Sequence, residues 1–393
     1  MRICLITTFF PPLHFGGDGV FVANFANALA NAGHQIHVIH CADSFWLTRG
    51  NVEPSPVLLH PGITVHTLSS ALGALSPILT QISGSPWLKR KKIAEILELG
   101  FDVIHWHNIS LIGGPGALDL GTGVKLCSLH DYWFTCPTHI LFKDKERACV
   151  QRNCLRCQLV YRRLPQLWRN TQWMAKGMSH IDRFLVPSLF VQEQFRKAPQ
   201  SLDTTVLPHF VPGLKPAAPD KCSDSGYYFY CGRLEKAKGL QTILPLFCRT
   251  GRRLLVAGSG SYETELRRLA ERGTNIEFLG RISYDKLNSL YRGARATLIP
   301  SICYETFGLV ALESLREQTP IITSGFGALL ELVSETGGGV VYQSNSQLES
   351  LLDQFDRYPE MAAELGRIGH SNIGKFSEAE HIRRFFQIVN SVR

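Results

Sequence analysis

The first forty residues, MRICLITTFFPPLHFGGDGVFVANFANALANAGHQIHVIH (residues 1–40), decide the fold class. An apolar run over 2–8 predicts a buried strand, and a loop with two prolines and three glycines follows over 10–19. Apolar residues recur at helical spacing over 20–32, Gly33 is placed to end that helix, and 35–40 has the pattern of the next strand. The order strand, loop, helix, strand predicts a doubly wound α/β domain.

The same alternation continues along the chain and then starts again after a Pro- and Gly-rich stretch. Further strands are expected at 63–68, 102–107 and 125–130, and a second series at 227–231, 253–257, 276–279, 296–300, 320–323 and 339–341. We therefore expect an N-terminal domain over 1–206 with a cysteine-bearing insert at 134–160, a linker over 207–224, a C-terminal domain over 225–376, and a terminal helix over 377–393 that packs back on the first domain.

Composition excludes several classes of protein. No run of about 18 uncharged apolar residues occurs, so a membrane-spanning helix is not expected. The start of the chain lacks the cleavage region of a signal peptide, which predicts a cytoplasmic protein. The net charge of +8 is spread over local clusters such as 89–92 and 162–163, and no nucleic-acid-binding motif accompanies them, so no nucleic-acid partner is expected.

The segment most informative about function is PSICYETFGLVALESLREQTPIITSGFGALLELV, residues 300–333. A helix that begins near Gly308 would turn its free amides toward the preceding loop, where they can bind phosphate or sugar oxygens. A carboxylate at Glu313 can bind the vicinal hydroxyls of a ribose, and the loop carboxylate at Glu305 can reach a sugar. Taken alone, the two carboxylates also fit surface glutamates at chance spacing.

Three other loops give that segment its context. GRLEKAKG (232–239) follows the first strand of the second series, so Arg233 and Lys238 stand where two cations can clamp a diphosphate. Gly258 allows a sharp bend after the next strand, and 281–282 follow the third. Because the carboxyl ends of parallel strands meet at one edge of a sheet, these loops predict a nucleotide-binding edge.

On these segments, most strongly over 228–335 and the first 40 residues, the sequence resembles glycosyltransferase family four, whose members are retaining enzymes with the two-domain GT-B fold. The resemblance implies two Rossmann-like domains that face each other across a cleft. It also implies a nucleotide-sugar donor and the following donor-binding residues: Gly16, Gly17, Arg233, Lys238, Gly258, Arg281, Ile282, Glu305, Phe307, Gly308, Leu309 and Glu313.

The resemblance gives the C-terminal residues separate roles. Arg233 and Lys238 would bind the donor diphosphate, and Glu313 would bind its ribose. Glu305 and the amides that follow it would hold the donor sugar and the β-phosphate. The backbone at 281–282 would meet the base.

The N-terminal domain would supply the remaining contacts. The loop with Gly16 and Gly17 would close over the phosphate, and His130 would be the active-site histidine that binds a sugar hydroxyl. From its own surroundings, at a strand end in HDYW, His130 also fits a satisfied core histidine. His107 and Asp18 are candidates for acceptor binding, and Asp18 also fits a helix N-cap.

The implied reaction is hexosyl transfer with retention, from a nucleoside diphosphate to a hydroxyl of a glycan or a lipid-linked acceptor, in surface polysaccharide or glycoconjugate synthesis. Preorganised cations and amides would stabilise the charge that grows on the leaving diphosphate. The chain contains no Asp-x-Asp triplet, so no catalytic metal is expected. The implied catalytic residues are His130, Glu305, Arg233 and Lys238.

Three other functions share parts of this pattern. A nucleotide-sugar epimerase of the same architecture would convert the donor without an acceptor, and a non-catalytic subunit would bind the donor without turnover. A dinucleotide-dependent oxidoreductase needs G-x-G-x-x-G after the first strand, and GGDG at 16–19 does not match it.

Four of the eleven cysteines are grouped as C-x12-C-x4-C-x2-C: Cys136, Cys149, Cys154 and Cys157. This spacing suits a structural zinc ion with four thiolate ligands, and the basic residues around it would offset the thiolate charge. Free thiols and an iron–sulfur cluster remain alternatives, while a reducing cytosol disfavours disulfides.

Two segments combine tryptophan with lysine and arginine, namely SPWLKRKK (85–92) and YRRLPQLWRNTQWMAKGM (161–178). Such pairing is typical of a membrane interface, so we expect peripheral contact with an anionic membrane on the inner face of the plasma membrane. The second segment equally fits a helix packed on the first domain.

Overall fold

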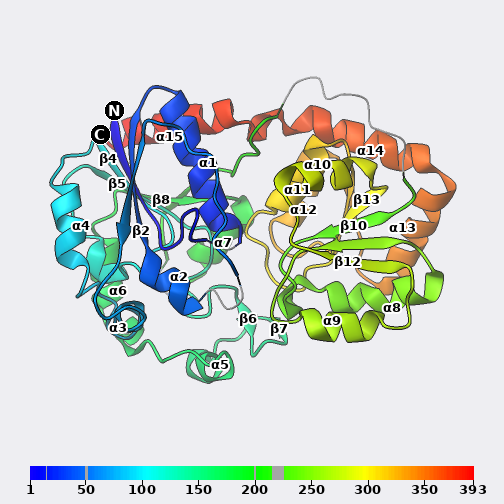
Figure 1. The fold of residues 1–393 in the computed structure, drawn as a ribbon, viewed down its shortest axis with the longest axis horizontal. Coiled ribbons are helices and arrows are strands. Elements are labelled where there is room, and N and C mark those ends of the chain that lie inside the picture. The colour runs from blue at the N-terminus through cyan, green and yellow to red at the C-terminus, as the bar shows by residue number, and fades with distance from the viewer. Residues whose placement is uncertain (15, 49–51, 199–200, 215–224) are drawn as a thin grey trace.

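Two parallel β-sheets form the centres of the two halves of the chain (Figure 1). The computed structural model describes residues 1–14, 16–48, 52–198, 201–214 and 225–393. Alternate residues of a central strand enter different apolar clusters, as Ile3 and Leu5 enter one and Cys4 and Ile6 another. Each sheet is therefore covered on both faces, as parallel sheets require.

The first sheet has seven parallel strands in the order β3-β2-β1-β4-β5-β8-β9. Its strands are β1 (Arg2–Ile6), β2 (Gln35–Cys41), β3 (Ile63–Leu68), β4 (Val103–Trp106), β5 (Val124–Ser128), β8 (Arg183–Val186) and β9 (Thr204–Val206). Its helices are α1 (Gly17–Asn31), α2 (Ala42–Thr48), α3 (Leu75–Ser83), α4 (Arg90–Leu97), α5 (Cys154–Val160), α6 (Trp173–Met178) and α7 (Leu189–Arg196), with 3-10 turns at Pro115–Ala117 and Leu167–Asn170.

The second sheet has six parallel strands in the order β12-β11-β10-β13-β14-β15. Its strands are β10 (Tyr228–Cys231), β11 (Leu254–Ala257), β12 (Ile276–Gly280), β13 (Ala296–Ile299), β14 (Ile321–Thr323) and β15 (Gly339–Val341). Its helices are α8 (Leu240–Thr250), α9 (Glu263–Ala270), α10 (Tyr284–Gly293), α11 (Leu309–Arg316), α12 (Leu329–Thr336), α13 (Asn345–Arg357) and α14 (Pro359–Asn372), with 3-10 turns at Lys236–Lys238 and Ile373–Phe376.

The predicted pair of doubly wound α/β domains is confirmed, since both sheets follow the Rossmann strand order. Of the predicted linker, residues 215–224 lie outside the described residues. None of the helices in the described ranges combines the length and apolar composition that a bilayer crossing requires.

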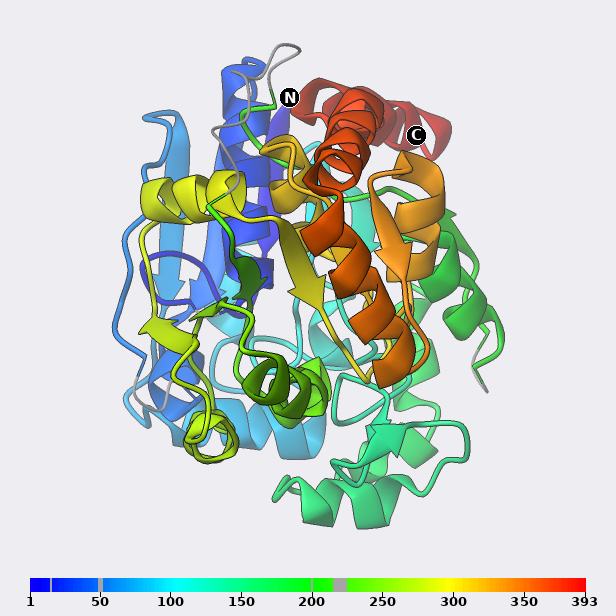
Figure 2. The same cartoon turned by 90° about the vertical axis from the view of Figure 1, so that its right-hand side faces the viewer.

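The last helix, α15 (Glu378–Ser391), returns from the second sheet to the first. Phe385 and Val389 join the apolar cluster that contains Phe25 and Leu29 of α1. Figures 1 and 2 both show α15 beside α1, close to the N-terminus. The C-terminal segment is therefore part of the N-terminal core.

The insert (134–160) forms a small antiparallel hairpin outside the first sheet. Its strands are β6 (Phe142–Lys143) and β7 (Arg147–Ala148). The hairpin lies between the two halves in Figure 1. Phe142, which is only 1% exposed, packs in one cluster with Ala237 and Cys303 of the second half. The insert thus connects the two halves next to the loops that follow β10 and β13.

Candidate functional site

In each sheet the strand order changes direction beside the first strand. The change lies between β1 and β4 in the first sheet and between β10 and β13 in the second. Ligands of such sheets bind at the carboxyl ends of the strands on either side of that point. In the second sheet those ends carry the loops 232–239 and 300–308. The predicted donor residues Arg233, Lys238 and Glu305 are on these two loops.

Lys238 and Glu305 form an ion pair between the two loops. The ammonium of Lys238 lies 2.7 and 2.9 Å from the two carboxylate oxygens of Glu305, and the side chains are 25% and 14% exposed. Ser301 donates a hydrogen bond to the same carboxylate. Although burial raises the pKa of Glu305, the charge of Lys238, these hydrogen bonds and the charge of Arg233 together hold that pKa below its usual value. The carboxylate is therefore ionised at neutral pH.

Arg233 lies at the carboxyl end of β10 with an exposed side chain. Its backbone is fixed, because the Tyr230 hydroxyl donates to its carbonyl at 3.0 Å and the next amide, of Leu234, donates to Ser259 at 3.0 Å. The guanidinium of Arg233 and the ammonium of Lys238 both act on the Glu305 carboxylate, so two cations are available to one anionic ligand.

The predicted helix start near Gly308 is observed: α11 begins at Leu309, with Gly308 as its N-cap. Gly308 has a φ of 104°, and a Cβ added there would lie 2.6 Å from the Leu329 side chain. Only glycine fits this position without strain. The first amides of α11 consequently face the loop that carries Glu305, where they can bind an anion.

Glu313 lies in the second turn of α11 and is half-buried. The hydroxyl of Tyr291 on α10 donates to its Oε2 at 3.0 Å. Burial raises the pKa of Glu313, while the bond from Tyr291 lowers it. The charge of Arg316 also lowers the pKa, so a phenol bond and a nearby cation both favour the ionised form of Glu313 against burial.

The N-terminal glycine loop lies opposite these donor loops. A Cβ added to Gly17 would lie 3.5 Å from Cδ1 of Leu309, so this exposed loop meets the start of α11. Burial lowers the pKa of His14 in the same loop, and the charge of Arg281 after β12 lowers it further. A cation of the second domain therefore acts on a side chain of the N-terminal glycine loop.

The nucleotide end of the predicted site is closely packed. Gly258 has a φ of 133°, and an added Cβ would lie 1.9 Å from the carbonyl oxygen of Gly232. Its amide donates to the Gly280 carbonyl at 2.8 Å. Gly258, which follows β11, therefore contacts both the residue after β10 and the last residue of β12. Arg281 and Ile282 come next in the chain.

Hydrogen bonds also join the two halves beside Glu305. The Ser188 hydroxyl donates to the Thr306 carbonyl at 2.9 Å. The carboxylate of Glu331 accepts from the amides of Leu189 and Phe190, both at 3.0 Å, and so binds the N-terminus of α7. These hydrogen bonds therefore join the start of α7 in the first half to the loop that carries Glu305 and to α12 in the second half.

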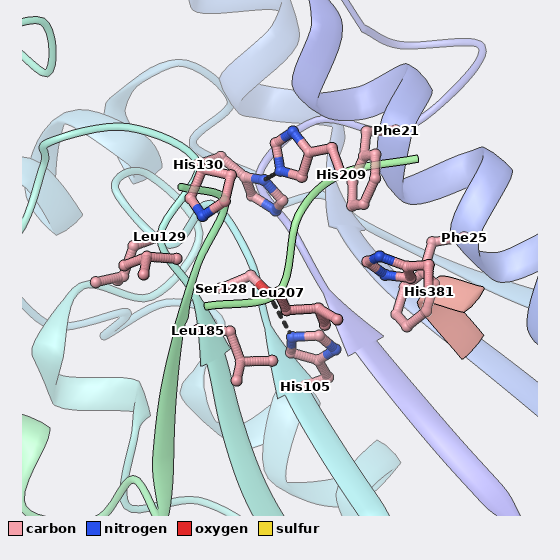
Figure 3. A pocket seen from close by; sticks show the side chains of 12 residues that line it. Phe21, Phe25, His105, Ser128, Leu129, His130, Leu185, Leu207, His209 and His381 are labelled. Atoms are coloured by element: carbon pink, nitrogen blue, oxygen red, sulfur yellow. Dashed lines mark hydrogen bonds between the residues drawn. The ribbon is translucent and has the colours of Figure 1, made fainter. Parts of the chain in front are cut away.

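His130 is buried at 7% exposure and bonded through both ring nitrogens. Its Nε2 lies 2.8 Å from Nδ1 of His107, and its Nδ1 lies 3.0 Å from Nε2 of His209. Burial lowers the pKa of His130, whereas Asp18 and Asp131 raise it. Figure 3 shows His130 and His209 together at one end of a small pocket that His105 and His381 also line.

The N-cap interpretation of Asp18 is wrong. Helix α1 begins at Gly17 with Gly16 as its N-cap, so Asp18 lies in the first turn. The charge of Asp18 raises the pKa of His130 against the effect of burial.

The zinc prediction is not supported. In the described part of the chain, no three or more His, Cys, Asp or Glu side chains gather in a group that could hold a metal ion. Cys136 Sγ lies 3.2 Å from the Thr138 hydroxyl, and Cys149 Sγ lies 3.8 Å from the Gln151 carbonyl. Burial and neighbouring thiols raise the pKa of Cys149 and of Cys154.

Ser301, Tyr291 and His209 lie outside the predicted set, and their side chains hydrogen-bond to Glu305, Glu313 and His130 within it. Ser301 has a local signal, because it stands in the same loop as Glu305. Tyr291 is 22 residues from Glu313 and His209 is 79 residues from His130, and no sequence spacing indicates either contact.

Two family profiles match the chain, one for each half. The profile described as Glycosyltransferase Family 4 matches residues 15–212, and the profile described as Glycosyl transferases group 1 matches residues 215–371. The chain is 26% identical over 361 residues to a glycogen synthase of Mycobacterium tuberculosis, covering 86% of this chain and 82% of that one. It is 27% identical to a D-inositol 3-phosphate glycosyltransferase of Acidothermus cellulolyticus, covering 86% and 79%.

Two solved structures have the same fold. The sucrose-phosphate synthase of Thermosynechococcus elongatus superposes with a TM-score of 0.74 at 18% identity, covering 100% of this chain and 98% of that chain. The Anabaena protein HepE in complex with UDP superposes with a TM-score of 0.68 at 16% identity, covering 100% of both. With the two Rossmann-like sheets, these likenesses establish the GT-B fold.

Proposed function

Since the chain belongs to glycosyltransferase family four and is a glycosyltransferase, we propose that it transfers a hexose with retention from a nucleoside diphosphate to a hydroxyl of a glycan or lipid-linked acceptor. The observation that carries this proposal is the Lys238–Glu305 pair beside Arg233 and the first amides of α11. We propose that this transfer serves the synthesis of surface polysaccharide or glycoconjugate.

In the proposed reaction, the bond between the anomeric carbon and the diphosphate oxygen breaks, and the electron pair leaves with that oxygen. Lys238, Arg233 and the α11 amides stabilise the resulting negative charge. The acceptor oxygen attacks the same face of the sugar, and its proton passes to the departing phosphate oxygen. Glu305 holds Lys238 and the donor sugar, and Glu313 binds the ribose.

We also propose that catalysis needs no divalent metal, because two cationic side chains and a helix N-terminus on neighbouring loops can supply the positive charge that a diphosphate needs. The relevant contacts lie on two loops that the Lys238–Glu305 pair already joins. HepE was solved with UDP, which makes UDP-sugars the first donors to examine for this chain.

The proposed function predicts that donor turnover persists without metal. Purified protein is incubated with UDP-, GDP- and dTDP-hexoses, with and without chelator, and released nucleotide and sugar products are identified by mass spectrometry. We expect nucleoside diphosphate release from one donor class, unchanged by chelator and increased by acceptor. An isomerised nucleotide sugar without release would indicate the epimerase, and binding without turnover would indicate the non-catalytic subunit. Turnover lost in chelator and restored by magnesium would overturn the metal-free step.

A peripheral membrane contact is proposed from one surface of the first domain. Leu75, Leu79 and Ile82 share one face of α3 and are 56%, 42% and 47% exposed. Leu164 and Leu167, which are 47% and 68% exposed, lie beside them, because Gln81 contacts the Leu164 carbonyl and Trp168 donates to the Gln81 carbonyl. We call these five leucine and isoleucine residues the apolar patch.

The charges around the apolar patch favour an anionic surface. The stretches 54–94 and 147–181, which carry the patch, contain no aspartate or glutamate. They carry exposed cations, including Lys91, Lys92 and Lys176. Apolar side chains bordered by cations are the usual composition of a surface that binds an anionic bilayer.

We expect the protein to sediment with vesicles that contain about 30% anionic lipid but not with neutral vesicles, and to be released by about 0.5 M salt. The double variant Leu79→Ser, Leu167→Ser is expected to lose most of this binding. The matched control is Leu330→Ser on α12, where an equally exposed leucine lies in the second domain. Equal sedimentation of the double variant and the control would contradict the proposed contact.

A further inference from the structure

The carboxylate of Glu313 on α11 is bonded through one of its two oxygens. The hydroxyl of Tyr291 donates to Oε2 at 3.0 Å. Within the residues that the structure describes, this is the one hydrogen bond that the carboxylate accepts, so Oε1 stays open. The side chain is half-buried rather than enclosed, and a ligand can therefore reach the open oxygen.

Tyr291 is a rigid hydrogen-bond donor. It is 0% exposed, and its ring meets the ring of Phe229 on β10 edge to face, with centroids 5.1 Å apart. Its carbonyl accepts from the Thr319 hydroxyl at 2.6 Å, so the backbone and the ring are both fixed. Burial raises the pKa of Tyr291 well above its usual value, so the phenol keeps its proton. The direction in which it bonds Glu313 is consequently set by the fold.

The nearby cation, Arg316, is engaged with other groups. It stands three residues after Glu313 on the same helix, and it donates to Glu317 at 3.1 Å and to the Pro212 carbonyl at 3.0 Å. Burial has the largest effect on the pKa of Glu313 and raises it, while the bond from Tyr291 and then the charge of Arg316 lower it. The phenol is therefore the group that both contacts the carboxylate and favours its charge.

The packing around Tyr291 brings Glu313 to the nucleotide end of the candidate site. Tyr291 belongs to one apolar cluster with Ala257 at the end of β11, Ile282 after β12 and Val310 on α11. Figure 1 shows α10 beside α11, and the two helices are in contact. Glu313 lies about 6 Å along the helix axis from the first residue of α11. A nucleotide whose phosphates bind the first amides of α11 would therefore extend its ribose toward Glu313.

We propose that Tyr291 is a positioning residue that holds Glu313 ionised and oriented for the vicinal hydroxyls of a ribose, so that the donor is a ribonucleoside diphosphate sugar. The inference deepens the proposed transfer reaction and rests on it, since the ribose contact of Glu313 belongs to that proposal. A carboxylate has about four acceptor positions, and the phenol occupies one of them. Two adjacent ribose hydroxyls fit the open positions, whereas a deoxyribose offers fewer donors.

The test removes hydroxyls from the ligand and from the protein. Calorimetric titration measures Kd for UDP, for GDP and for their 2′,3′-dideoxy analogues, and the base that the wild-type protein binds more tightly is used for all variants. We expect wild-type protein to bind the ribonucleotide at least about tenfold more tightly than the dideoxy analogue, because the analogue cannot bond the carboxylate. Tyr291→Phe is expected to weaken the ribonucleotide about tenfold and the dideoxy analogue less than about twofold.

The matched control is Tyr227→Phe. Tyr227 packs in the same apolar cluster as Tyr291, and its hydroxyl donates to the Leu290 carbonyl at 2.8 Å. This variant also loses a buried phenol, but the phenol is bonded to the backbone and not to Glu313. We expect its preference for the ribonucleotide to stay within about twofold of the wild-type preference.

A second variant shows whether Tyr291 acts through Glu313. Glu313→Gln is expected to reduce the preference for the ribonucleotide about as much as Tyr291→Phe does, and the double variant is expected to lose little more, because the two substitutions remove one shared interaction. The double variant leaves no carboxylate without its partner, so it carries the comparison if Tyr291→Phe alone is unstable. Additive losses in the double variant would contradict a role that passes through Glu313.

The two ligands separate a positioning role from a structural one. Equal weakening of the ribonucleotide and the dideoxy analogue in Tyr291→Phe would overturn the inference, because a general disturbance of the site acts on both. A wild-type protein that binds both ligands equally would overturn it too, while sugar transfer would stand. A wild-type protein that prefers the ribonucleotide but releases no nucleoside diphosphate from any donor would instead remove the proposed function.

Discussion

Lys238→Ala is expected to lower the rate of sugar transfer by at least about 100-fold and to weaken donor binding, because one preorganised charge at a developing oxyanion is worth a factor of that order. The variant also removes the cation that lies 2.7 Å from Glu305. The pKa of that carboxylate should rise, because burial is then opposed only by Ser301 and Arg233. Steady-state kinetics and calorimetric titration of the nucleoside diphosphate measure both effects.

Lys236→Ala is the matched control for this prediction. Lys236 belongs to the same 3-10 turn and has an exposed side chain. We expect its removal to change kcat and donor Kd by less than about twofold, since an exposed charge is screened by solvent. Equal effects of the two substitutions would mean that the turn contributes only general positive charge, and that Lys238 is not part of a clamp.

Acid is expected to destabilise the fold between about pH 6.5 and pH 4. Burial lowers the pKa of His381 to about 4, and the same cause lowers the pKa of His105, His107, His130 and His209. A histidine with a depressed pKa stays neutral in the folded state while the unfolded chain takes up a proton, so stability is complete above pH 6.5 and decreases as pH falls. His381 alone contributes roughly 3 kcal/mol to this decrease by pH 4.

Urea unfolding at a series of pH values between 4 and 8 measures the effect, and His381→Asn identifies its source. Asparagine does not titrate and keeps a donor near the Pro208 carbonyl, which His381 contacts at 2.7 Å. We expect a flatter dependence of the free energy of unfolding on pH in this variant. His180→Asn, at an exposed histidine, should leave the slope unchanged. A wild-type slope in both variants would contradict the assignment to His381.

The regular part of the fold could be predicted because its signals are local. The central strands read as apolar runs, and the glycine loop before α1 marks the first turn. The domain architecture and the start of α11 follow from such patterns. The strands β8 and β9 are short, at four and three residues, and β9 carries two threonines, so their apolar signal is weak. Their place in the sheet is set by pairing with β5 and with each other.

The candidate site could be predicted only where one loop carries the residues. The loops with Lys238 and Glu305 each follow a strand, and strand order brings them together. The partners of His130 could not be predicted, because His209 reaches it from the domain connection and His107 from another strand. The cysteine spacing predicts a zinc site, but the described part of the chain holds no group of metal-ligating side chains that could bind one. A spacing in sequence does not fix the direction of a side chain.

The hairpin of the insert has a consequence for how far the molecule can open. Phe142 belongs to the first half of the chain but is enclosed by Ala237 and Cys303 of the second. Separating the halves at that end would expose a phenyl ring to water, at about 2–3 kcal/mol. The opposite end is joined by the polypeptide itself, through residues 207–211 and α15. At the insert, the two halves are therefore joined by apolar packing, whereas at the opposite end they are joined covalently by the chain.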